Sequence, residues 1–118
     1  MKRRAYLAAL IRLYLQPPGA PALASRHDWA TAQALYAQGV PLHELLHAIR
    51  LATLRRLQRT GPPLPPICSL AYYRHVLQRL SPEEREPGYV LYVAERYRNL
   101  VNQSARSNRQ NRALSDRQ

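Results

Sequence analysis

The stretch that decides the fold reads Val40-Pro41-Leu42-His43-Glu44-Leu45-Leu46-His47-Ala48-Ile49-Arg50-Leu51-Ala52-Thr53-Leu54-Arg55-Arg56-Leu57-Gln58-Arg59. Gly39 and Gly61 bracket this run, and Pro41 suits the first position of a helix, where its missing N–H would have no partner. The helical period predicts a buried face made of Leu42, Leu45, Leu46, Ile49, Ala52, Thr53 and Leu57. A second stripe, expected to lie mostly outside that face, consists of His43, His47, Arg50 and Leu54.

Periodic apolar segments on both sides of this run predict further helices over residues 2–16, about 26–38, 70–80, and 89 to about 103. Trp29, Ala32, Leu35 and Tyr36 are expected to form the apolar side of the second helix. Residues 60–66 contain four prolines and predict an extended connector. No segment has the alternation of a strand, so the predicted fold class is all-α, a compact bundle of about five helices.

The composition changes at residue 104. Residues 104–118 contain one leucine and four arginines, which is too little apolar surface for a packed segment. We therefore expect two parts: a helical domain over residues 1–103 and a disordered basic tail over residues 104–118. Arg12 interrupts the N-terminal apolar run, which is why we interpret that run as a helix and not as a signal peptide.

Charge is the strongest compositional feature. Eighteen Lys and Arg residues stand against seven Asp and Glu residues, and the net charge is +11. Seventeen of the eighteen are arginine, whose guanidinium group binds phosphate oxygens in pairs and stacks on bases. This balance favours nucleic acid as the partner. A genome rich in G and C would also favour arginine codons, but it would not explain the shortage of acids.

The run His43-Glu44-Leu45-Leu46-His47 matches the H-E-x-x-H motif of zinc hydrolases. Those enzymes need a third ligand, and the metzincin continuation would place Gly and His where this chain has Arg50 and Thr53. We therefore expect no metal, no cofactor and no catalytic residue, with both histidines exposed or at the rim of a basic helix face. The only cysteine, Cys68, excludes an internal disulfide, fits a cytoplasmic protein and is expected to be a small buried thiol.

A family pattern appears in residues 29–80: a helix with Trp29, the run from Gly39 to Ile49, a proline-rich gap, and then Ser69-Leu70-Ala71-Tyr72-Tyr73-Arg74-His75-Val76-Leu77. This order resembles the DnaD-like domain of bacterial and phage replication-initiation proteins. Members of that family carry a Tyr-x-x-x-Ile-x-x-x-Trp motif implicated in single-stranded DNA binding. Tyr72, Val76 and Leu80 stand at its three positions, with leucine in place of tryptophan. The resemblance implies a small helical module for replication or mobile-element DNA work, without catalysis.

The expected function is therefore a non-enzymatic, basic DNA-binding accessory that binds single-stranded or non-specific DNA. Tyr72 and Tyr92 could stack on unpaired bases, whereas Tyr73, Tyr89 and Tyr97 are expected in the core and Tyr72 could belong there as well. The predicted nucleic-acid-binding residues are Arg50, Arg55, Arg56, Arg59, Tyr72, Arg74, Arg79, Arg96, Arg98, Arg106, Arg109 and Arg112. Two alternatives remain: an adaptor whose apolar helix faces dock a helicase or transposase, and the zinc hydrolase. No apolar run is long enough to predict a membrane partner.

Overall fold

The chain folds as a bundle of helices wrapped around the segment that the sequence makes central. A computed structural model describes the backbone of residues 1–116 and the side chains of residues 1–103. Its elements are α1 (Arg3–Leu15), α2 (Arg26–Ala37), α3 (Leu42–Gln58), α4 (Leu70–Gln78), the short 3-10 helix η1 (Glu83–Arg85) and α5 (Pro87–Asp116). No strand occurs in the described backbone, and the all-α prediction is confirmed. None of the helices described is long and apolar enough to cross a bilayer.

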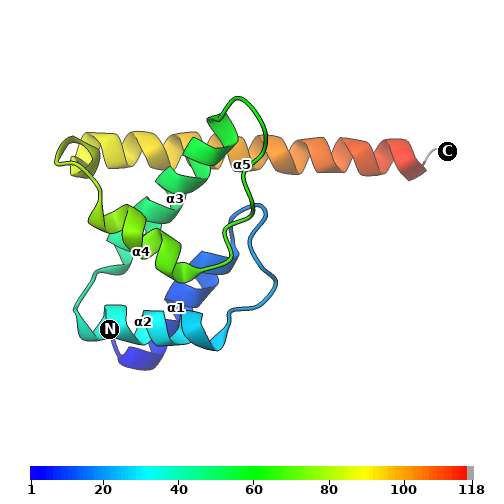
Figure 1. Cartoon of the computed structure of the whole chain (residues 1–118). Helices are drawn as coiled ribbons and strands as arrows, with labels where there is room; N and C mark the ends of the chain where they lie inside the picture. The colour runs from blue at the N-terminus through cyan, green and yellow to red at the C-terminus, as the bar shows by residue number, and fades with distance from the viewer. Residues whose placement is uncertain (117–118) are drawn as a thin grey trace.

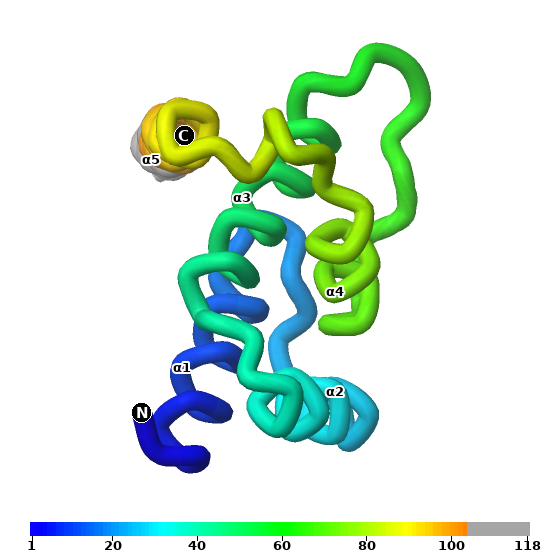
Figure 2. The backbone as a smooth tube through the Cα atoms, turned by 90° about the vertical axis from the view of Figure 1, so that its left-hand side faces the viewer, coloured from blue at the N-terminus to red at the C-terminus, as the bar shows by residue number. Residues whose placement is uncertain are grey.

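Helix α3 touches most of the other elements. It packs against α1, α4 and α5, while α2 packs against α1 and α4. Figure 1 shows α5 lying across one end of the bundle and continuing past it, with α1 and α2 at the opposite end. Figure 2 shows the same helix end-on, beside α3. Because α5 projects past the bundle, the molecule is elongated, with extents of 53 × 33 × 28 Å along its principal axes.

Local sequence signals set the helix boundaries. At the start of α2 the Ser25 hydroxyl accepts a hydrogen bond from the Asp28 amide at 3.1 Å, and the Asp28 carboxylate accepts one from the Ser25 amide at 2.9 Å. This reciprocal capping box satisfies two backbone donors that no helical carbonyl can reach. Gly39 has a φ of +72°, and its conformation turns the chain from α2 into α3 within a few residues. Ser69 caps α4 through the Ala71 amide, as predicted.

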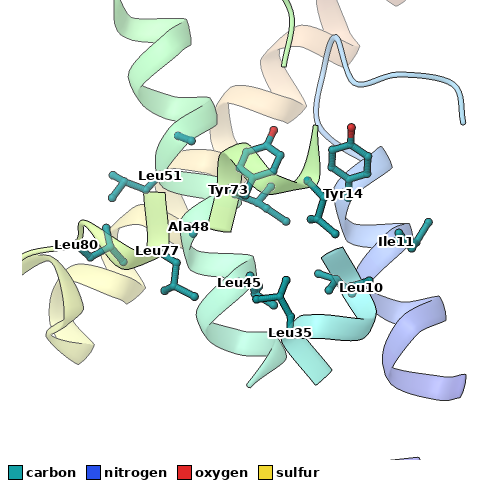
Figure 3. Packing of buried hydrophobic residues seen from close by; sticks show 14 of the residues in the cluster. Leu10, Ile11, Tyr14, Leu35, Leu45, Ala48, Leu51, Tyr73, Leu77 and Leu80 are labelled. Carbon is teal, nitrogen blue, oxygen red and sulfur yellow. The ribbon is translucent and has the colours of Figure 1, made fainter. Parts of the chain in front are cut away.

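The core is one cluster in which four helices meet. Figure 3 shows Leu10 and Tyr14 of α1 facing Leu35 of α2, Leu45 of α3 and Tyr73 of α4. Val93 supplies the buried contact from α5. Burying each large apolar side chain contributes roughly 1.5–3 kcal/mol, which makes this cluster the main source of stability. Tyr73 is buried, and Tyr89 and Tyr97 pack half-buried against the core, so the prediction for these three tyrosines is confirmed.

Five burial predictions were wrong. His47 and Leu54 were expected outside the apolar arc of α3, yet both are buried. Helix α5 packs along α3, and η1 carries the carbonyl that His47 contacts, so these two residues of the second stripe are covered, whereas His43 stays exposed. Conversely, Trp29 is 40% exposed, because α1 and α4 cover α2 on the side of Ala32 and Leu35.

The fourth wrong prediction concerns the loop between α3 and α4. Cys68 is exposed there and not the expected buried thiol, because it lies before α4 begins. Leu57 of α3 is also exposed, since the last turns of that helix extend toward the proline-rich loop. Helix α5 begins at Pro87, two residues earlier than predicted. The disordered tail predicted for residues 104–118 falls on residues whose side chains lie outside the described part.

Candidate nucleic-acid interface

A cleft at the C-terminal end of α3 brings together part of the predicted basic surface. Its volume is about 280 Å³. Arg55, Arg56 and Arg59 line it from α3 and the residue that follows, and Tyr72 lines it from α4. Its remaining walls are Ala52, Leu64 and Val76. Three of the predicted arginines and the predicted stacking tyrosine therefore share one concave site, which we call the arginine cleft.

The elements around the arginine cleft hold its side chains in place. The loop after α3 folds back along it, and the Arg56 guanidinium donates a hydrogen bond to the Pro65 carbonyl. Tyr72 meets the ring of the buried Tyr73 edge-on, with ring centroids 5.7 Å apart and planes at 88°. The Tyr72 side chain is 42% exposed. Its ring is thus in contact with Tyr73 and remains partly accessible to a ligand.

Arg55 already has an anionic partner. Its guanidinium forms an ion pair with the Glu84 carboxylate of η1. The other Glu84 oxygen accepts a hydrogen bond from the Ser81 amide at 2.9 Å, and the Ser81 hydroxyl accepts one from the Glu84 amide. Hydrogen bonding from the Ser81 amide, together with the charge of Arg55, lowers the pKa of Glu84. Glu84 therefore stays ionised at neutral pH and offsets one of the three charges in the cleft.

Five other predicted arginines, all within residues 1–103, do not line this cleft. Arg50 is half-buried between α3 and α5, where its charge acts on Tyr97 and its Nε has no hydrogen-bond partner among the described residues. Arg74 is half-buried on α4, and Arg79 is exposed at the end of that helix. Arg96 and Arg98 are exposed on α5. Arg106, Arg109 and Arg112 belong to the part of α5 whose side chains are not described.

The two histidines of the H-E-x-x-H motif have different surroundings. His43 is exposed, whereas His47 is only 5% exposed and its Nε2 donates a hydrogen bond to the Glu84 carbonyl at 2.8 Å. Tyr89 packs against the His47 ring edge-on. Glu44 and both histidines line a small cavity of about 120 Å³. Within residues 1–103, no three His, Cys, Asp or Glu side chains are grouped as metal ligands. His47 thus links α3 to η1 through its hydrogen bond to the Glu84 carbonyl.

Sequence reasoning missed two residues that shape this region. Nothing in the sequence pattern links Glu84 to Arg55, which lies 29 residues earlier. The Arg85 guanidinium donates hydrogen bonds to the carbonyls of Leu77 and Leu80 at 2.7 and 3.3 Å, and so satisfies acceptors at the end of α4. A cation just beyond a helix end is the one signal that could have indicated this role.

No match was found when the chain was compared with protein-family models, with curated proteins and with solved structures.

Proposed function

We propose that this chain is a non-enzymatic DNA-binding module that binds single-stranded or non-specific DNA. The observation that carries this proposal is the arginine cleft, where Arg55, Arg56 and Arg59 lie beside the half-exposed ring of Tyr72. Guanidinium groups bind phosphates without regard to sequence, and an aromatic ring stacks on any unpaired base. Such a site needs no catalytic group, because binding is its whole activity.

The net charge supports the same proposal. A protein with a charge of +11 attracts a polyanion from a distance, and the arginine cleft then offers it a shaped contact. By its resemblance to DnaD-like domains, we propose that the module serves replication or transposition of a bacterial or mobile element. Its single free cysteine fits work in the cytoplasm.

One observation favours a second function, that of an adaptor for a protein partner. Leu91 and Tyr92 are adjacent on α5 and both are exposed. An exposed leucine beside an exposed tyrosine is the composition of a small protein-binding surface. A helicase or transposase could dock there, and in that case the positive charge would serve solubility only.

Fluorescence anisotropy separates these two functions. Labelled single-stranded and double-stranded oligonucleotides are titrated with the protein over a series of salt concentrations. The DNA-binding proposal predicts saturable binding that weakens as salt rises, with a smaller salt dependence for the double variant Arg55→Ala, Arg56→Ala. Absence of binding even at low salt would favour the adaptor. An unchanged salt dependence in the double variant would remove the arginine cleft from the proposal.

A further inference from the structure

A second cavity lies directly beside the arginine cleft. Its volume is about 300 Å³, and we call it the proline cavity. One wall is the connector between α1 and α2, with Pro17, Pro18, Gly19 and Ala20, and the facing wall comes from the loop between α3 and α4, with Pro63, Pro66 and Ile67. Figure 1 shows these two connecting segments, in blue and green, on the same side of the bundle.

The two cavities share part of their walls. Arg56 and Leu64 line both of them, so they stand between the arginine cleft and the proline cavity. The hydrogen bond from Arg56 to the Pro65 carbonyl fixes the guanidinium at this boundary. A guanidinium carries five N–H donors, so a bond to one carbonyl leaves donors available for another acceptor. A ligand that fills both cavities must therefore pass over a fixed cation.

We infer that the proline cavity is a nucleobase subsite for the same strand whose phosphates bind in the arginine cleft. This inference rests on the proposed function. Apart from Thr53 and Arg56, its lining is mostly apolar, with several prolines and Ile67, and such a lining suits the flat apolar face of a base better than a phosphate. A volume of about 300 Å³ is at the lower end of cavities that hold small organic ligands.

The order of the groups matches the order of a polynucleotide. A base in the proline cavity, a phosphate on Arg56 and a second base beside Tyr72 follow the alternation of bases and phosphates along one strand. A base that enters the proline cavity is removed from its pairing partner, and extracting it from a duplex costs a few kcal/mol. The ligand is therefore an unpaired strand of at least two nucleotides, and a single nucleotide cannot satisfy both subsites.

A variant that fills the proline cavity tests this inference. Ala20 lines the cavity, whereas Ala22 is exposed on the same connector and does not line it. Ala20→Phe is therefore compared with the matched control Ala22→Phe, using two ligands: oligothymidylate, which has bases, and inorganic polyphosphate, which has none. Ala20→Phe is expected to weaken oligothymidylate binding roughly 5- to 150-fold, the loss that one stacked base gives. Binding of polyphosphate is expected to stay unchanged, because the arginines are untouched.

Amide chemical shifts in the wild-type protein give a second readout that does not depend on how the variants fold. Adding oligothymidylate is expected to shift the amide signals of Gly19, Ala20 and Ile67, and polyphosphate is expected to leave them in place. The inference is overturned if Ala20→Phe and Ala22→Phe bind oligothymidylate equally, or if these amides do not respond to bound DNA; the DNA-binding proposal survives both results. Failure of the wild-type protein to bind oligothymidylate at low salt overturns both.

Discussion

The carboxylate of Asp28 in α2 accepts a hydrogen bond from the Leu70 amide at the start of α4, at 3.0 Å and across 42 residues of sequence. Its other oxygen accepts the Ser25 amide at the start of its own helix. One buried carboxylate, only 2% exposed, thus caps two helices. Each cap satisfies a backbone donor that would otherwise be buried without a partner. The contact also holds α4, which carries Tyr72, against α2.

Replacing this carboxylate by an amide should destabilise the fold. Asp28→Asn leaves one acceptor oxygen, so one of the two amides loses its partner, at a cost of about 1–3 kcal/mol. Urea unfolding followed by circular dichroism measures this loss. Ala30→Asn is the control, because Ala30 is an exposed residue of the same helix. A loss no greater than that of the control would mean that Asp28 does not link the two helices.

The stability of the wild-type protein should also depend on pH through Asp28. Burial alone would raise the pKa of this carboxyl, but the hydrogen bonds from the Leu70 and Ser25 amides outweigh that effect and lower it. The stability from Asp28 is therefore complete above about pH 4, where the unfolded carboxyl is ionised, and is lost as pH falls through the lower pKa of the folded state. Acid titrations of unfolding should show a smaller loss for Asp28→Asn than for the wild-type protein. Equal losses would contradict the lowered pKa.

Removal of the hydroxyl group should cost more stability at Tyr6 than at Tyr14, although both tyrosines lie on α1. The Tyr6 hydroxyl donates a hydrogen bond to the Val40 carbonyl at 2.7 Å, so Tyr6→Phe should cost about 0.5–1.5 kcal/mol. The Tyr14 hydroxyl is buried near the Asp28 carboxylate, without a hydrogen bond of good geometry among the described residues, so Tyr14→Phe should cost less than Tyr6→Phe. The free energies of unfolding of the two variants measure the difference. A larger loss for Tyr14→Phe would contradict this assignment.

Tyr14 should also contribute to unfolding in alkali. Burial, together with the charge of Asp28, raises the pKa of Tyr14 to about 12. The stability linked to its neutral hydroxyl is thus present below about pH 10, where an unfolded tyrosine ionises, and is lost as pH rises toward 12. Titration of tyrosinate absorbance in the wild-type protein and Tyr14→Phe measures this group. The two curves should differ near pH 12, and a difference centred near pH 10 would contradict the raised pKa.

The ion pair between Arg55 and Glu84 should weaken DNA binding in the wild-type protein. A DNA phosphate must compete with the Glu84 carboxylate for the same guanidinium. Glu84→Gln removes that competition and keeps an oxygen to accept the Ser81 amide. It should therefore raise affinity for oligothymidylate more than Glu83→Gln, a control with the same charge change at an exposed neighbour. The Arg55 side chain of this ion pair is largely exposed, so loss of the pair should cost at most about 1 kcal/mol of stability. Equal affinities of the two variants would mean that Glu84 does not mask Arg55.

Metal removal should leave the fold unchanged. The Nε2 of His47, which would face a zinc ion in an H-E-x-x-H enzyme, donates to the Glu84 carbonyl instead. Treatment with a chelator should therefore not shift the thermal unfolding midpoint, and purified protein should contain no stoichiometric zinc. Elemental analysis and a melting curve check both points. A zinc content near one per chain, lost together with stability on chelation, would restore the hydrolase as the function.

Local signals predicted most of the fold. The helical period of α3, the cap at Ser25, the turn at Gly39 and the cap at Ser69 depend on neighbouring residues, so they can be read from the sequence. Contacts between distant segments could not be read in this way. The second stripe of α3 looked like a polar face until η1 and α5 were placed over it, and only that placement explains why His47 is buried.

The candidate site, too, could be predicted only where its residues are close in sequence. Arg55, Arg56 and Arg59 lie close together in sequence, so their grouping could be predicted from the helix alone. That Tyr72 joins them, and that Glu84 pairs with Arg55, follows from how α4 and η1 pack beside α3. Arg96 and Arg98 were predicted to extend the same surface, but neither lines the arginine cleft.

The central claim is that a particular group of arginines, and not the charge of the whole protein, binds DNA. Two triple variants test it: one changes Arg55, Arg56 and Arg59 to Gln, and the other changes Arg3, Arg4 and Arg12, which are exposed on α1, to Gln. Both lower the net charge by the same amount, and circular dichroism checks that both fold. The measurement is the affinity for labelled single-stranded oligothymidylate across a salt series. The arginine-cleft variant should lose most of its affinity, and its salt slope should fall by about two, as loss of three phosphate contacts gives. The α1 variant should keep most of its affinity and most of its salt slope. Equal losses of affinity in the two variants would contradict the claim.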